Sequence, residues 1–265
     1  MSRLEDKVAV VTGASSGFGR AIARAFAAEG ARVVVSDIRE QPLPGGFEDD
    51  IQTTTVEAIE ADGGTAVYVS CDVTRPEQTD ALIAAAVERF GRLDILMNNA
   101  GIYRGGKLMH EFSEADLDAC FTVNVKGTWF PSQAAIRQFL AQGDGGTIIN
   151  LVSTAGLQGH PRQSVYNTSK GAQANLTRCL AIEYGHEGIR VNGICPTYAK
   201  TALTRELVDD KDFDRVFTES IPLKRWGEAA DIAALAVFLA SEESSYIHGD
   251  LVRVDGGETL CRYSV

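Results

Sequence analysis

The stretch that decides the fold is KVAVVTGASSGFG, residues 7–19. Its first five residues form a short apolar run, which predicts a buried strand. The glycines predict a tight turn, and the apolar spacing from Phe18 to Phe26 predicts a helix after it. Free N–H groups and the helix dipole face such a turn, so the three elements together indicate a pyrophosphate site. Taken alone the glycine spacing is a weak signal, because small residues also let any helix pack closely on a sheet.

A second apolar run, residues 31–36, ends at Asp37, about twenty residues past the glycines, where a carboxylate can accept ribose hydroxyls. The alternative interpretation of Asp37 is a solvated strand end. A carboxylate at this place repels a 2′-phosphate, and neither Ser15 nor Ser16 offers a compensating cation. We therefore predict NAD rather than NADP as the cofactor, although Arg39 lies close by.

Strand and helix patterns alternate along the whole chain, which predicts a parallel sheet with helices on both faces. We expect an α/β protein: one domain over residues 1–265 with a Rossmann fold, a doubly wound seven-stranded parallel sheet. No internal repeat or low-complexity stretch interrupts the pattern. The expected strands are residues 7–11, 31–36, 65–69, 93–97, 147–152, 189–194 and 251–254.

Composition narrows the classes of function. A net charge of −11 disfavours nucleic acid and anionic membranes, which bind clustered Lys and Arg. No apolar run approaches the roughly 18 residues that span a bilayer, and the first residues have no signal-peptide core. Five cysteines without a C-x-x-C pair indicate reduced thiols, so we expect a cytoplasmic protein. The four histidines are scattered, so we expect no metal.

Tyr166 and Lys170, four residues apart, lie on one face of a predicted helix. The cation would favour the phenolate and lower the tyrosine pKa from about 10 by roughly 1 to 3 units. Ser153 follows the apolar run 147–152, at the carboxyl end of a strand where ligands of open α/β sheets bind. A proton-transfer site is one interpretation; an accidental helix pair is the other, and it is the commoner one for this spacing alone.

Several motifs occur in order, and the chain resembles the short-chain dehydrogenase/reductase family over nearly its full length. The TGASSGFG loop is similar to that family's cofactor loop, CDV (71–73) to its adenine contact, and NNAG (98–101) to its nicotinamide-side segment. The resemblance implies a catalytic tetrad of Asn124, Ser153, Tyr166 and Lys170. It further implies a cofactor site formed by Gly13, Ser15, Ser16, Gly17, Phe18, Gly19, Asp37, Ile38, Asp72, Val73, Asn99, Ala100, Gly101, Tyr166, Lys170, Pro196, Thr197, Ala199 and Thr201.

The resemblance also assigns roles within the tetrad. Tyr166 is the base in oxidation and the acid in reduction, and Lys170 lowers its pKa and binds the nicotinamide ribose. Ser153 orients the substrate oxygen, and Asn124 holds a water that links the lysine to solvent. Many members are tetramers that pair the helices after strands four and five, so we expect a homotetramer built through residues 115–140 and 164–184.

Three segments depart from a minimal pattern. The family usually carries Pro-Gly after strand six, whereas Thr197 follows Pro196 here. Residues 40–50, rich in Pro, Gly and acidic residues, predict a loop insertion that either covers the cofactor or is a solvated surface loop, the second being the commoner case. Residues 197–226 are long for a connection in a compact domain and indicate a substrate lid with short helices of its own.

These patterns predict an oxidoreductase that transfers a hydride reversibly between NAD(H) and a small-molecule substrate, a secondary alcohol or ketone of moderate size. Alternatives are an acyl-carrier-protein-linked 3-ketoacyl reductase, a sugar dehydrogenase and a non-catalytic NAD-binding sensor. Aromatic residues beside a few polar groups favour a cyclic or aryl substrate over a simple sugar. The expected substrate walls are Tyr103, Ser153, Thr154, Gln158, His160 and Tyr198.

Overall fold

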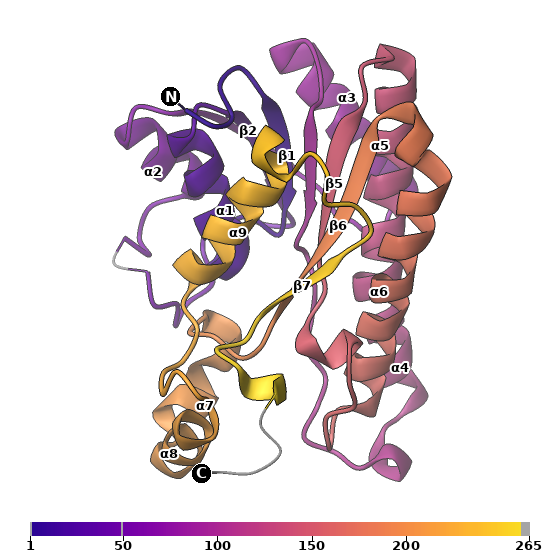
Figure 1. Ribbon diagram of the computed structural model, residues 1–265. Helices are drawn as coiled ribbons and strands as arrows, with labels where there is room; N and C mark the ends of the chain where they lie inside the picture. Colours follow the sequence, from indigo (N-terminus) through magenta and orange to yellow (C-terminus); the bar gives the residue numbers. More distant parts are fainter. Residues whose placement is uncertain (1, 49, 261–265) are drawn as a thin grey trace.

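A computed structural model describes residues 2–48 and 50–260 of the chain. Seven parallel strands form one sheet in the order β3-β2-β1-β4-β5-β6-β7. Figure 1 labels β1, β2, β5, β6 and β7 of this sheet. All seven predicted strands are present, with ends shifted by at most two residues. Their bounds are β1 Val8–Thr12, β2 Arg32–Asp37, β3 Thr65–Ser70, β4 Ile95–Asn98, β5 Gly146–Leu151, β6 Ile189–Pro196 and β7 Leu251–Val254.

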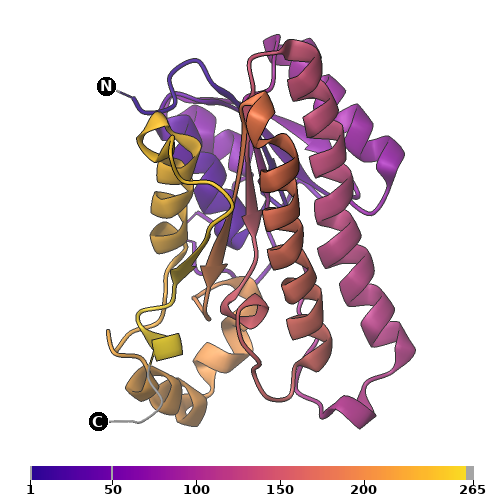
Figure 2. The same cartoon turned by 45° about the vertical axis from the view of Figure 1, so that its right-hand side comes forward.

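Helices cover both faces of the sheet, as a doubly wound fold requires. Helices α1, α2 and α9 lie on one face and α3, α5 and α6 on the other, where Figure 2 shows α5 and α6 side by side. These helices are α1 Gly17–Ala28, α2 Thr55–Ala61, α3 Pro76–Phe90, α5 Gly127–Gln142, α6 Ser164–Tyr184 and α9 Ala229–Ala240. None of the described helices is long and apolar enough to cross a membrane.

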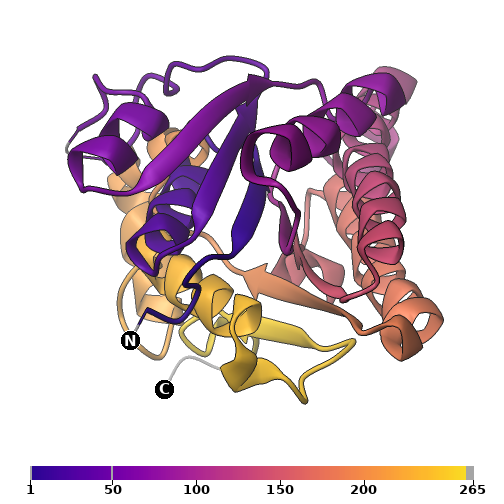
Figure 3. The ribbon, with the colours of Figure 1, turned by 90° about the horizontal axis from the view of Figure 1, so that it is seen from above.

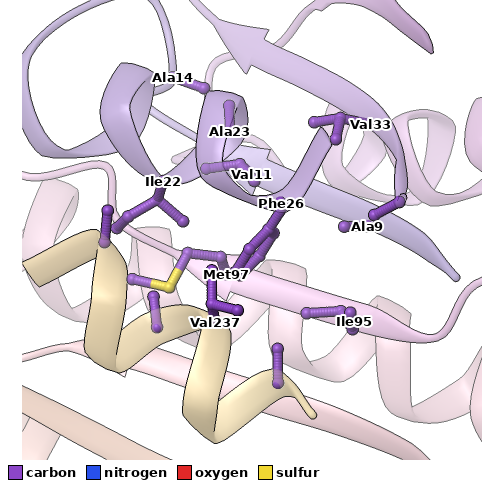
Figure 4. Close-up of a cluster of buried hydrophobic side chains, with 14 of the residues drawn as sticks. Ala9, Val11, Ala14, Ile22, Ala23, Phe26, Val33, Ile95, Met97 and Val237 are labelled. Atoms are coloured by element: carbon purple, nitrogen blue, oxygen red, sulfur yellow. The ribbon is translucent and has the colours of Figure 1, made fainter. Parts of the chain in front are cut away.

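Side chains along each central strand alternate between two cores, because successive residues of a strand point to opposite faces. On β1, Ala9 and Val11 pack toward α1 and α9, whereas Val8 and Val10 pack toward the helices of the other face. Figure 4 shows the first of these cores, with Phe26 of α1 among the strand residues. Both faces of the central strands are therefore buried, which explains why they read as continuous apolar runs.

The direction of strand succession reverses between β1 and β4, which are neighbours in the sheet although β2 and β3 lie between them in sequence. Figure 3 shows the sheet from above, with β1 and β2 on one side of this point and β5 and β6 on the other. A crevice forms at such a point outside the carboxyl ends of the strands, and it is the usual ligand site of an open α/β sheet.

Two further helical regions lie near the carboxyl ends of the strands or connect them. Between α4 (Glu114–Cys120) and α5, residues Phe121–Lys126 form a π-helix rather than the α-helical turns that the sequence pattern predicted. The segment after β6 forms α7 (Arg205–Asp209) and α8 (Lys211–Ser220), which lie together at the bottom of Figure 1. The prediction that this segment has short helices of its own agrees with the structure.

Candidate active site

A cavity of about 690 Å³ opens at the carboxyl ends of the strands. It runs from the glycine turn and Asp37 to Ser153, Tyr166 and Lys170, so one space joins the two sites predicted from sequence. Every predicted cofactor residue except Gly19 lines it. A volume of this size is typical of a small-molecule or cofactor site.

The glycine turn needs glycine at two positions. Gly13 has a φ of +63°, and a Cβ there would lie 2.8 Å from the Cα of Ala100. A Cβ on Gly19 would collide with the Gly13 carbonyl and the Asn99 side chain. Asn99 explains the close approach, because its Nδ2 donates to the carbonyls of Thr12 and Gly13, both at 2.9 Å. The NNAG segment thus fixes the shape of the turn.

Asp37 lies at the other side of the turn, at the end of β2. Its Oδ2 accepts the Ser15 N–H at 3.2 Å and its Oδ1 accepts the Ile38 N–H at 2.8 Å. Burial raises the pKa of Asp37, and the hydrogen bonds from Ser15 and Ile38 partly offset that increase. Asp72 is held by Thr74, whose hydroxyl donates at 2.7 Å and lowers the pKa of the carboxyl.

The chemistry-bearing residues come from β5 and α6. Ser153 follows β5, and a hydrogen bond with it partly offsets the burial that raises the pKa of Tyr166. Lys170 lies one helical turn after Tyr166 in α6, with its Nζ 5.7 Å from the centre of the tyrosine ring. This ammonium donates to the Leu151 carbonyl at 2.8 Å. The helix pair predicted from spacing therefore points into the cavity beside Ser153.

The predicted direction of the Tyr166 pKa is wrong. Burial raises the pKa of Tyr166 to about 12, and burial lowers the pKa of Lys170 to about 7. Sequence spacing identified the opposite charge next to the phenol but not the desolvation of both groups, which disfavours each charged form. Burial likewise raises the pKa of Cys195 to about 11, so this neighbouring thiol stays protonated at neutral pH.

Asn124 is fully buried in the π-helix and does not line the cavity. Its Oδ1 accepts the Ile102 N–H at 2.8 Å, and its Nδ2 donates to the Ile102 carbonyl and to Ser169 Oγ, both at 3.0 Å. The side chain thus fastens the segment after NNAG to helix α6. Its predicted part in a water relay stays a prediction.

Aromatic rings form the substrate end of the cavity. Tyr103 meets Tyr166 edge to face with ring centres 5.1 Å apart. Tyr198 packs edge to face on Phe213 and Phe217 of α8, with centres at 6.1 and 5.4 Å. Thr154 and His160 line the cavity with these rings.

The structure corrects the prediction for Gln158. This residue is exposed and lies outside the cavity, because the turn after the short helix Thr154–Gly156 carries it away from the strand ends.

Thr197, which follows Pro196, has an ordinary backbone conformation. Of the described residues other than glycine, only Asp6, Arg162 and Lys224 have a positive φ. The replacement of the family's glycine therefore introduces no strain after β6.

The 40–50 insertion is packed rather than free in solvent. The Leu43 N–H donates to Ser16 Oγ at 2.6 Å, and the Gly17 N–H donates to Glu48 Oε1 at 2.7 Å. Buried Arg20 of α1 pairs with Asp50 at 3.0 Å. The loop thus lies against the glycine turn, and whether it covers a bound cofactor stays a prediction.

Arg205 of α7 joins this loop to the segment after β6. Its Nε and Nη2 donate to the carbonyls of Gly45 and Gly46 at 2.9 and 2.7 Å, and its guanidinium lies 3.6 Å from the centre of the Phe47 ring. Sequence reasoning missed Arg205 and Glu48. No local signal could identify them, because their partners lie far away along the chain.

The chain is similar to known reductases and dehydrogenases. A family model described as enoyl-(acyl carrier protein) reductase matches residues 13–259. The 2-dehydro-3-deoxy-D-gluconate 5-dehydrogenase of Escherichia coli K12 is 39% identical, covering 96% of each chain. A putative short-chain alcohol dehydrogenase from Sinorhizobium meliloti 1021 has a TM-score of 0.88 at 37% identity, covering 97% of this chain and 98% of that one.

A further solved structure is a gluconate 5-dehydrogenase from Burkholderia cenocepacia J2315 in complex with NADP and tartrate. It is 34% identical with a TM-score of 0.88, and the match covers 98% of this chain and 97% of that one. Fold, cavity and comparisons together define an oxidoreductase that acts on alcohol groups with a nicotinamide dinucleotide. The chain belongs to the short-chain dehydrogenase/reductase family.

Proposed function

We propose that this enzyme is an NAD-preferring dehydrogenase that interconverts a secondary alcohol of moderate size and its ketone. The observation that carries the proposal is a single cavity with a ribose-binding carboxylate, Asp37, at one end and Ser153, Tyr166 and Lys170 at the other. Such an arrangement binds an extended dinucleotide and holds a substrate oxygen next to a proton donor.

The residues present fit a dinucleotide. Gly13 and Gly17 line the cavity without side chains, and the Asp37 carboxylate suits two ribose hydroxyls but repels a 2′-phosphate. The relative from B. cenocepacia was solved with NADP, so membership of this family does not by itself decide between NAD and NADP. When bound, the nicotinamide ring accepts or supplies the hydride.

Each residue of the tetrad has a task in this mechanism. Ser153 orients the substrate oxygen, and Tyr166 takes its proton in oxidation or returns it in reduction. Lys170 binds the ribose and, when it carries its proton, favours the phenolate. Asn124 fixes the distance between α6 and the segment after NNAG through its three hydrogen bonds. These residues bring the reacting groups into contact, which supplies a large part of a rate enhancement.

The substrate end favours a neutral, cyclic or aryl alcohol. Tyr103, Tyr166 and Tyr198 line it. Among the described residues that line the cavity, the Lys and Arg side chains are Lys170 and Arg39, and Arg39 lies at the Asp37 end. A sugar acid bound beside the tyrosines would have Lys170 as the one Lys or Arg side chain among the described residues that line this end.

A sugar-acid dehydrogenase is the second candidate, and the names of the E. coli and B. cenocepacia relatives favour it. The deciding experiment measures NADH formation from cyclic alcohols, aryl carbinols, hydroxysteroids, gluconate and neutral sugars, with NADP in parallel. We expect the highest kcat/KM from a hydrophobic alcohol with NAD. A higher kcat/KM for gluconate or a sugar would replace the first candidate by the second.

The proposal extends to assembly and location. Exposed apolar residues on the helices expected to pair include Trp129 and Ile182, which are 51% and 84% exposed in the single chain. They support a homotetramer, for which light scattering at micromolar concentration is the test: a monomer would contradict it. We further propose a cytoplasmic enzyme without nucleic-acid or membrane partners, in keeping with the charge of −11.

A further inference from the structure

A second carboxylate lies at the glycine turn. Ser15 and Gly17, two residues apart, donate their N–H groups to Asp37 and Glu48 respectively. Backbone amides two residues apart lie within about 7 Å of each other, so both acids act on the same small region. Asp37 comes from the end of a strand, whereas Glu48 is supplied by the 40–50 insertion.

The charge of Glu48 is poorly compensated. Within residues 2–48 and 50–260, Glu48 has no Lys, Arg or His in ion-pair range, and its Oε2 is buried without a hydrogen-bond partner. The guanidinium groups that reach this loop have other partners: Arg205 bonds the carbonyls of Gly45 and Gly46 and pairs with Asp209 at 3.7 Å, and Arg20 pairs with Asp50 at 3.0 Å. A half-buried charge of this kind is screened less by salt than an exposed one.

Glu48 lies next to Gly17, the first residue of α1, and this position affects the binding of a phosphate. The helix N-terminus is where anions bind, and here the protein's own anion holds the Gly17 amide. An added negative group on the adenosine ribose, next to Asp37, would lie in the electrostatic field of both carboxylates. Glu48 does not line the cavity, so it acts through its field rather than through contact.

We propose that Glu48 is a specificity-determining residue that, together with Asp37, disfavours a dinucleotide with a 2′-phosphate. The proposal rests on the proposed function, because it concerns the cofactor of that same cavity. It assigns a role to the insertion: the loop brings a negative charge to the glycine turn, and its bonds to Ser16 and Arg205 hold that charge in place.

The test is Glu48→Gln, which removes the charge and keeps an oxygen that can accept the Gly17 N–H. Dissociation constants of NADH and NADPH are measured by fluorescence titration, so the result does not depend on a substrate. Removing one unit charge near the ribose should lower the preference for NADH over NADPH about 3- to 10-fold. The change should be smaller at high salt, because salt screens the charge. Glu40→Gln, an exposed acid in the same loop, is the matched control and should leave the preference within about twofold.

Glu48→Lys separates charge from structure. If the field acts, NADPH gains further relative to NADH; if the variants only loosen the loop, both dinucleotides weaken equally, and that result overturns the proposal. An unchanged preference in Glu48→Gln overturns it as well. Failure of the wild-type protein to bind either dinucleotide would instead contradict the proposed function, so the two failures are distinguishable.

Discussion

The two ends of the cavity hold their charged groups by different means. At the nicotinamide end, Tyr166 and Lys170 lie on a long helix packed on the sheet, and burial sets both pKa values. At the adenosine end, Asp37 and Glu48 accept backbone N–H groups of the glycine turn, and neighbouring residues Ile38 and Arg39 are exposed. The proposed chemistry therefore depends on a helix packed on the sheet, whereas the proposed choice of cofactor depends on a strand end, at Asp37, and on a loop, at Glu48.

The largest expected effect lies at the nicotinamide end. Tyr166→Phe removes the proton donor while keeping the ring that packs on Tyr103, so we expect kcat to fall about 10²- to 10⁴-fold. The NADH dissociation constant should change less than about threefold. If the variant kept more than a small fraction of wild-type kcat, the assigned chemistry would be wrong and the contrast between the two ends would disappear.

The next effect lies at the adenosine end. Asp37→Asn keeps the acceptor for the Ser15 N–H but removes the charge, so we expect the kcat/KM ratio of NAD to NADP to fall roughly tenfold. The value of kcat with saturating NAD should stay nearly the same, because the chemistry is at the other end. A preference for NADP in the wild-type enzyme would refute the role given to Asp37.

The third prediction tests whether burial dominates at Lys170. Its pKa is about 7 in the folded protein and 10.5 for the unperturbed side chain, so between these values the unfolded state binds more protons. Stability should therefore rise with pH across this window, by up to about 1.4 kcal/mol per pH unit from this group. Above pH 10 the raised pKa of Tyr166 acts in the opposite direction.

Lys170→Met should remove this part of the rise in Tm between pH 7 and 9.5, whereas Lys211→Met, at an exposed position in α8, should preserve it. Thermal unfolding of the three proteins at each pH gives the comparison. Parallel curves for wild type and Lys170→Met would show that the ammonium is not desolvated in the folded protein.

The smallest effect concerns the contact that closes the adenosine end. Arg205→Ala removes two hydrogen bonds and the stacking on Phe47, all at the surface, so we expect NADH to dissociate about two to five times faster. Stopped-flow displacement measures the dissociation rate. The control is Arg215→Ala, the same substitution at an exposed arginine of α8. Equal rates in wild type and Arg205→Ala would mean that the loop does not retain the cofactor.

The sequence allowed the sheet and the glycine turn to be predicted, because strands read as apolar runs and ligand-binding residues follow strand ends. The tetrad came from the resemblance to a known family, and its role stays a prediction. Asp37 was predictable from its place at a strand end. Glu48 and Arg205 were not, since the bond from Arg205 to Gly45 spans 160 positions and no periodicity reports such a contact. The Tyr166 pKa was predicted in the wrong direction because spacing reveals a neighbouring charge but not the depth at which both groups are buried.

In the π-helix of residues Phe121–Lys126, the regularity of the helix conflicts with the contacts of Asn124. Such a turn contains one residue more than the α-helical turn it replaces, so the helices before and after it are out of register by one position. Deleting one residue here would restore a regular helix with better hydrogen bonds, but it would rotate Asn124 away from Ile102 and Ser169. The regular hydrogen bonds of a helix and the contacts of Asn124 therefore favour opposite outcomes, and the irregular turn keeps the contacts at the cost of regularity.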